Sequence, residues 1–183
     1  MDTTTYMIIA VVLVLVIVGA LLAPVFIRRQ RSKQYSHQFG LEYDHTVEST
    51  GSEKKAQKEL VERQKHIDTL NIRPLSIRER DRYLADWTAV QAKFVDQPGQ
   101  ATVEADRLIM EVMQLRDYPV SDFDQRAADI SISYPELVSN YRAAREIAVK
   151  NKQDLASTEE LRQAMILYRS LFGELLETET VAA

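Results

Sequence analysis

Hydrophobic residues follow two different patterns along this chain. From Tyr6 to Ile27 they form one continuous apolar run, and beyond it they recur every three or four positions, as in amphipathic helices. At about 1.5 Å per residue the run spans roughly 33 Å, close to the ~30 Å hydrocarbon core of a bilayer. The pattern predicts an all-α protein, with one N-terminal transmembrane helix followed by a multi-helix bundle domain.

The apolar run is typical of a retained anchor rather than of a cleaved secretory signal. A signal peptide begins with basic residues, whereas the leader here carries Asp2 and no Lys or Arg. The basic residues follow the run instead, in a group that we call the basic cluster: Arg28, Arg29, Arg31 and Lys33. Because Lys and Arg resist translocation, we expect a single-pass protein of the cell membrane, with its N-terminus outside and its domain in the cytoplasm.

The anchor region also suggests two kinds of contact. The basic cluster is a candidate membrane-interface site, where it would bind anionic lipid headgroups or act only as a topology determinant. Gly19 and Ala23 share one face of the anchor helix and would allow two backbones to pack closely, although such pairs often arise by chance. A homo-oligomer is therefore one possible outcome of anchoring.

Glycine, proline and capping residues divide the rest of the chain into predicted helices. We assign residues 1–27 to the tail and anchor, 28–75 to the basic segment and amphipathic helices, and 76–183 to the bundle core. In the segment 52–71, Arg63 interrupts an approximate heptad seam of Ala56, Leu60, Ile67 and Leu70. Two heptads favour a helix that packs on its own domain, with an intermolecular coiled coil as the alternative.

Two capping boxes give the strongest signals in the bundle core. Ser76 is followed by Glu79, and Ser157 by Glu160, at the spacing that starts a helix. The first of these helices is expected to bury Tyr83, Trp87, Val90 and Phe94. Further helices are predicted after Pro98, from about Asp122 and from Pro135, with a non-helical connector at 130–134.

The composition of the chain argues against several kinds of binding and active site. The chain has 23 Lys and Arg against 27 Asp and Glu, a net charge of −4, and a mildly acidic domain is a poor nucleic-acid binder. It has no cysteine, which excludes thiol nucleophiles and cysteine zinc sites. Its glycines are isolated, and His37, His45 and His66 lack the spacing of a metal pair. We therefore predict no catalytic, cofactor-binding or metal-ligating residue, and the balance is against an enzyme.

One short stretch of the chain is rich in charged residues. Asp122, Arg126 and Asp129 crowd a short segment, and Tyr141 and Arg142 of the following helix are candidates to meet them in a polar groove. The main interpretation is structural, since Asp122 suits a helix cap and Arg126 suits pairing with either aspartate. The alternative is a binding groove between the late helices.

Several segments resemble a known family. Through IRPLS, WTAVQAKFVDQPGQATVEADRLIMEVM and YPVSDFDQRAADISISYPELVSNYRAA the chain is similar to uncharacterised bacterial proteins with a single N-terminal membrane anchor and an all-helical cytosolic domain. The resemblance covers most of residues 28–183 and implies no activity. Relatives usually carry proline at Leu41, glycine at Asp117 and often histidine at Arg145. We expect Gly40 to close the first helix and a second helix to run from about Leu41 to Thr50; the alternative is that Leu41 lengthens the first helix across Gly40. Arg145 weakens any histidine-based site.

These observations favour a membrane-tethered interaction or scaffold module that binds a protein partner or itself. The alternative is a small membrane-bound enzyme or ligand-binding domain that uses the polar groove. A third hypothesis is a protein that acts on the envelope through lipids and depends on the basic cluster.

Overall fold

The computed structural model describes residues 33–177 of the chain. A helical segment at 33–39 precedes α2 (Leu41–Thr50), α3 (Glu53–Thr69), α4 (Ile77–Lys93), α5 (Pro98–Leu115), α6 (Phe123–Ser133), α7 (Val138–Asn151) and α8 (Thr158–Leu175). These residues contain no strand, so the all-α prediction is confirmed for them. The expected anchor at 6–27 and the basic cluster before Lys33 lie outside this range. Within 33–177, no helix is both long enough and apolar enough to cross a membrane.

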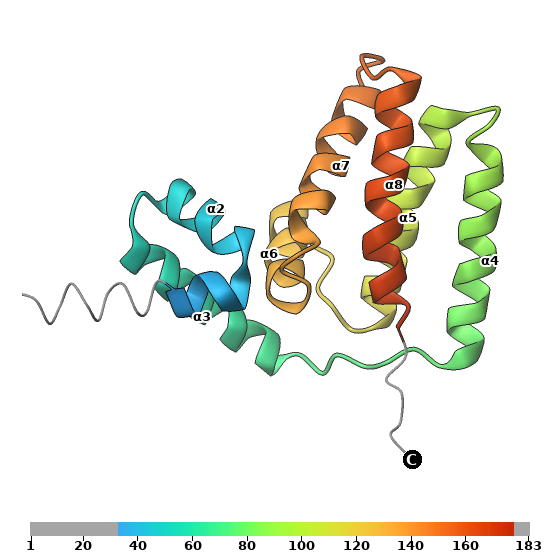
Figure 1. Cartoon of the computed structure of the whole chain (residues 1–183). Coiled ribbons are helices and arrows are strands. Elements are labelled where there is room, and N and C mark those ends of the chain that lie inside the picture. The colour runs from blue at the N-terminus through green and yellow to red at the C-terminus, as the bar shows by residue number, and fades with distance from the viewer. Residues whose placement is uncertain (1–32, 178–183) are drawn as a thin grey trace, which may run out of the picture.

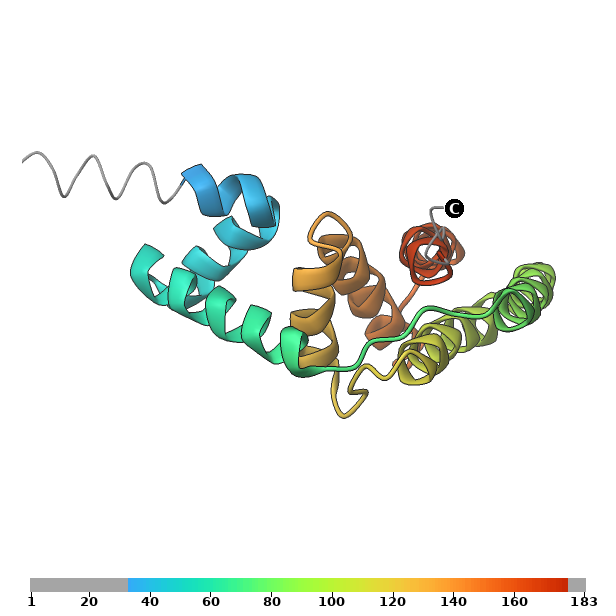
Figure 2. The same ribbon diagram turned by 90° about the horizontal axis from the view of Figure 1, so that it is seen from below.

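The helices form two packed groups (Figure 1). In the larger group, α8 packs between α5 and α7, and α4 lies at the outer edge against α5. In the smaller group, α2 and α3 pack on each other and contact the bundle through α6 and α7. Figure 2 shows the non-helical segment after α3 running past the end of the bundle to reach α4. The N-terminal helices are thus attached to the side of the bundle opposite α4.

Both predicted capping boxes are formed. The Ser76 hydroxyl accepts the Glu79 amide at 3.3 Å, and the Glu79 carboxylate accepts the Ser76 amide at 2.8 Å. Ser157 and Glu160 make the same two bonds at 3.3 and 2.8 Å. These bonds satisfy backbone amides that have no partner within the helix. A hydrogen bond from Arg73 and one from the Ser76 amide lower the pKa of Glu79 to about 2.

The main hydrophobic core lies inside the larger group. Trp87 of α4 stacks on Phe172 of α8, with ring centroids 4.6 Å apart. Tyr83 and Val90 are buried beside Trp87 as predicted, whereas Phe94 is only partly buried and packs against the core from its edge. Small buried side chains let the backbones of α5, α7 and α8 approach closely: Ala101, Ala105, Ala144, Ala148 and Ala164.

A second, smaller hydrophobic cluster holds the N-terminal helices together. Phe39 and Tyr43 are buried against Leu60 of α3, and Tyr35 packs on the same cluster. Ile132 of α6 also packs there, so the cluster touches the bundle. The two hydrophobic clusters meet at α6.

The predicted connector at 130–134 is wrong, because α6 continues through Ser133. The alternation that suggested an extended segment has a different cause. Ile130 is buried in the main core, whereas Ile132 packs against the N-terminal cluster, so one short helix has apolar residues on two sides. A helix that lies between two hydrophobic clusters needs apolar residues on both of the sides that face them.

Of two other predicted helix boundaries, one is confirmed and one differs. Gly40 has φ 52° and ends the first segment, and α2 runs from Leu41 to Thr50 as predicted, so Leu41 does not lengthen the first helix. Helix α7 begins at Val138 rather than at Pro135, because a turn in which the Leu137 amide bonds the Tyr134 carbonyl at 2.9 Å comes first.

Candidate functional site

The structure separates the five residues considered for a polar groove. Arg126 and Tyr141 do meet, with the Arg126 Nε donating to the Tyr141 hydroxyl at 3.1 Å. Asp122 caps α6 by accepting a backbone amide at 2.8 Å and is exposed. Asp129 lies near α3, and Arg142 binds a carboxylate of α2. Only one pair of the five is therefore in direct contact.

That α2 carboxylate belongs to Glu42, which is fully buried. Its Oε1 accepts hydrogen bonds from Arg63 of α3 at 2.8 Å and from Arg142 of α7 at 2.9 Å, and its Oε2 accepts a second bond from Arg142 at 2.5 Å. Burial alone would raise the pKa of Glu42, but the hydrogen bonds and charges of Arg142 and Arg63 outweigh it and lower that pKa. The carboxylate is therefore charged at neutral pH and joins three helices.

Arg63 extends this network to α6. It donates to Glu59 at 2.5 Å and to the Ser131 hydroxyl at 3.2 Å, in addition to Glu42. These bonds explain why an arginine interrupts the predicted seam of α3. Sequence reasoning missed Glu42, although a charged residue in an otherwise apolar seam signals a buried opposite charge.

Asp129 of α6 adds a second buried carboxylate beside Arg63. Its Oδ1 accepts a hydrogen bond from Gln125 at 2.8 Å and lies 3.8 Å from the His66 Nε2, while its Oδ2 has no hydrogen-bond partner among the described residues. Burial raises the pKa of Asp129. We call Glu42, Arg63, Asp129 and Arg142 the polar seam, since together they join α2 and α3 to the bundle.

The other groove candidates belong to a polar cluster inside the bundle. Phe123 packs against Tyr141 with ring centroids 5.1 Å apart, and the guanidiniums of Arg126 and Arg145 lie 6.0 and 5.3 Å from the Phe123 ring centroid. Arg145 also pairs with Asp106 of α5 at 3.3 Å. Burial raises the pKa of Tyr141, so its phenol stays protonated. These contacts hold α5, α6 and α7 together.

Across residues 33–177, no group of three His, Asp or Glu side chains is arranged to hold a metal ion. His66 and Asp129 approach one another, but as a pair in the polar seam.

A groove of about 400 Å³ lies between α4 and α5. Its floor includes Val90 and Leu108, and its rim carries charges of both signs. Lys93 pairs there with Glu104 at 2.5 Å, and Arg107 pairs with Glu111. Because these charges neutralise one another, the groove has no strong preference for an anion or a cation.

The outer surface of α4 exposes a line of apolar residues. Ile77, Leu84 and Val95 are 72%, 40% and 83% exposed, and Thr88 and Gln91 lie between them at helical spacing. Val95 directly follows the last turn of α4, and the other residues belong to the helix. We call these five residues the outer stripe. The charged residues Arg80 and Asp81 lie between Ile77 and Leu84, so the outer stripe offers three separate exposed apolar side chains rather than a continuous apolar face.

Comparisons with known proteins give no relative. No protein-family model, no curated protein and no solved structure matches the chain. The family resemblance therefore stays a prediction.

Proposed function

We propose that this chain is a membrane-tethered interaction module. Residues 6–27 anchor it in the cell membrane with the N-terminus outside, the helical domain lies on the cytoplasmic side, and the outer stripe binds a helix of a protein partner. The observation that carries the proposal is the exposure of Ile77 and Leu84 on the outer side of α4 and of Val95 just beyond its end.

The outer stripe suits a partner helix for a physical reason. Ile77 and Leu84 lie two turns apart on the outer side of α4, and Val95 lies just beyond its end. Full burial of an exposed Leu, Ile or Val contributes at most about 1.5–3 kcal/mol to association, and less for Leu84, which is only 40% exposed. The core face of α4 is already occupied, since Tyr83, Trp87 and Val90 are buried in the main core. Its outer line is therefore free to bind another helix.

The attachment of the N-terminal helices supports a tether of fixed geometry. Phe39 is buried, and Tyr35 stacks against Phe39 and Tyr43 with centroids 6.1 and 6.2 Å apart. The chain that follows the basic cluster is thus packed into the domain, and the polar seam joins it to the bundle. Such an arrangement holds α4 at a constant position relative to the 33–39 segment, where the described part of the chain begins.

The orientation is tested by cysteine labelling, because the chain has no cysteine of its own. Full-length protein with Thr3→Cys should react with an impermeant maleimide added to intact cells, whereas Val149→Cys should react only after the membrane is opened. Labelling of Val149→Cys in intact cells would show that the domain lies outside and overturn the proposed orientation.

The partner surface is tested by photocrosslinking in membranes. A photoreactive amino acid at position 88, in the outer stripe, should form a covalent adduct, and one at Ser139, on the exposed side of α7, should not. Leu84→Glu should abolish the adduct, while the matched change Leu155→Glu, also at an exposed leucine, should leave it intact. The mass of the adduct tells a different protein from a second copy of this chain. Monomers alone under every condition would refute the proposal.

A further inference from the structure

Lysine is unevenly distributed in this chain. Four of its eight lysines lie in α3, at Lys54, Lys55, Lys58 and Lys65, and all four are exposed. The single arginine of the helix, Arg63, faces the opposite way into the polar seam. Helix α3 therefore binds the rest of the domain through its arginine and presents lysines to solvent.

Three of these lysines fall on one line of the helix. We call the line the lysine stripe, and it consists of Lys54, Lys58, Val61 and Lys65. Val61 is also exposed, so the stripe has an apolar residue between its charges. Glu62 borders it and pairs with Lys58 at 3.6 Å, which offsets part of the charge of Lys58, and Glu53 is exposed beside Lys54. Asp68 beyond the stripe accepts a hydrogen bond from Gln64.

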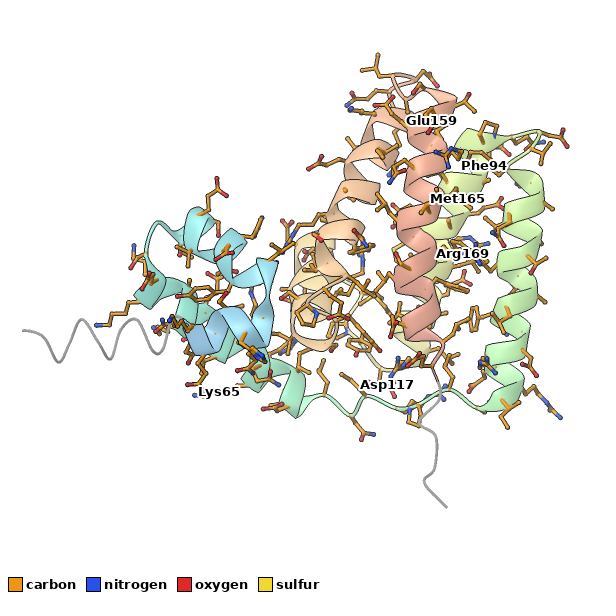
Figure 3. The ribbon with its side chains drawn as sticks, in the orientation of Figure 1. Lys65, Phe94, Asp117, Glu159, Met165 and Arg169 are labelled. Carbon is orange, nitrogen blue, oxygen red and sulfur yellow. The ribbon has the colours of Figure 1, made fainter. Side chains whose placement is uncertain are left out.

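The lysine stripe belongs to the part of the domain that is nearest the proposed anchor. Leu60, on the opposite face of α3, packs against Phe39 and Tyr43. Helix α3 and the 33–39 segment lie side by side in Figures 1 and 2. Lys33, the last residue of the basic cluster, begins that segment and is exposed. In Figure 3, Lys65 of α3 lies at the lower left of the molecule, whereas Glu159 at the start of α8 lies at the top of the bundle.

We infer that the lysine stripe contacts anionic lipid headgroups of the membrane in which the chain is anchored, as a second attachment beside the basic cluster. The inference rests on the proposed function, because it needs the anchor to hold α3 close to the bilayer. The potential of an anionic membrane falls off within a Debye length, about 8 Å in physiological salt, so only residues held at the surface feel it.

The chemistry of the lysine stripe fits this partner. A lysine ammonium on its flexible stem is a mobile point charge that binds phosphate without demanding one geometry, whereas arginine favours fixed two-point contacts such as those in the polar seam. The whole chain has a net charge of −4, so an anionic leaflet repels most of the domain. Attraction at α3 and repulsion elsewhere orient the bundle away from the membrane.

The test uses full-length protein in nanodiscs of phosphatidylcholine, with or without phosphatidylglycerol, that contain a lipid with a quencher in its headgroup. A fluorophore attached to Val61→Cys should be quenched several-fold more in the anionic discs than in the neutral discs, and added salt should reverse the difference. The same label on Leu155→Cys, in the turn between α7 and α8, should show no such difference.

Two matched variants separate this contact from general electrostatics. Lys54→Gln, Lys58→Gln and Lys65→Gln together should remove the extra quenching at position 61. The control variant replaces three exposed arginines elsewhere by glutamine and so removes the same amount of charge. It should leave the extra quenching at position 61 unchanged, and it changes Arg78, Arg80 and Arg169. Protein that incorporates into the discs but shows equal quenching at position 61 in both lipids overturns the lipid contact alone. Failure to incorporate overturns the anchor, and the contact with it.

Discussion

Replacing Glu42 with glutamine should destabilise the domain strongly. The substitution keeps the size of the side chain but removes the buried charge that Arg63 and Arg142 bind at 2.8 and 2.9 Å. Breaking a buried ion pair costs about 3–5 kcal/mol when the remaining charge is left without a partner. Here the arginine side chains are 21% and 23% exposed and Arg63 keeps Glu59, so water and Glu59 compensate part of the loss. We expect the free energy of unfolding to fall by about 2–3 kcal/mol.

Denaturant unfolding of the full-length protein in detergent measures this loss. Far-UV circular dichroism follows all helices, whereas the fluorescence of Trp87, the only tryptophan, follows the bundle core. The matched control is Glu48→Gln, an exposed glutamate of the same helix, which should change stability by no more than about 0.5 kcal/mol. The denaturant midpoints measured by circular dichroism and by fluorescence are compared in each variant. If these two midpoints lie further apart in Glu42→Gln than in the control, α2 and α3 detach before the bundle unfolds.

At acid pH, the wild type and Glu42→Gln should have the same free energy of unfolding. The pKa of Glu42 is lower in the folded protein than its ordinary value of 4.5, so its contribution is complete above that value and is lost as the pH falls through the folded-state pKa. Equal free energies of unfolding for Glu42→Gln and Glu48→Gln at neutral pH would refute the argument that this ionic network holds the helices together.

Three further changes test other parts of the fold by the same denaturant measurement. Ser76→Ala removes a capping hydroxyl and should cost about 1 kcal/mol. Asp117→Gly should raise stability by about 0.5 kcal/mol, because Asp117 has φ 65°, in the region that favours glycine. Gly99→Ala should be destabilising, because the new Cβ would lie 2.7 Å from the Asn151 Oδ1; adding Asn151→Ala should cost less than the sum of the two single changes.

The sequence predicted those elements whose signals are local. Ser76 and Glu79 form their capping box within one helical turn, so four residues suffice to recognise it. The apolar spacing of Tyr83, Trp87 and Val90 likewise identifies a buried face without knowledge of what covers it. Such features depend only on the main-chain geometry of one helix, so the local sequence is sufficient to predict them.

Features that depend on distant residues were missed. Arg63 is visible in the sequence as an unusual seam residue, but its partner Glu42 is 21 positions away in another helix. The groove candidates failed to assemble for the same reason, because Arg142 pairs with a carboxylate that precedes it by 100 residues. The alternation of Ile130 and Ile132 was misread because only tertiary structure shows a hydrophobic cluster on each side of α6.

The separation of 100 residues between Glu42 and Arg142 also has a consequence for the order of events during synthesis. A ribosome translates Glu42 long before it reaches α7, so the buried carboxylate has no complete partner set while α4, α5 and α6 are being made. If the proposed anchor holds, the first helices would already be at the membrane during that interval. Final docking of α2 and α3 would then take place at the membrane surface, and any factor that binds the nascent chain there would meet the N-terminal helices before the bundle.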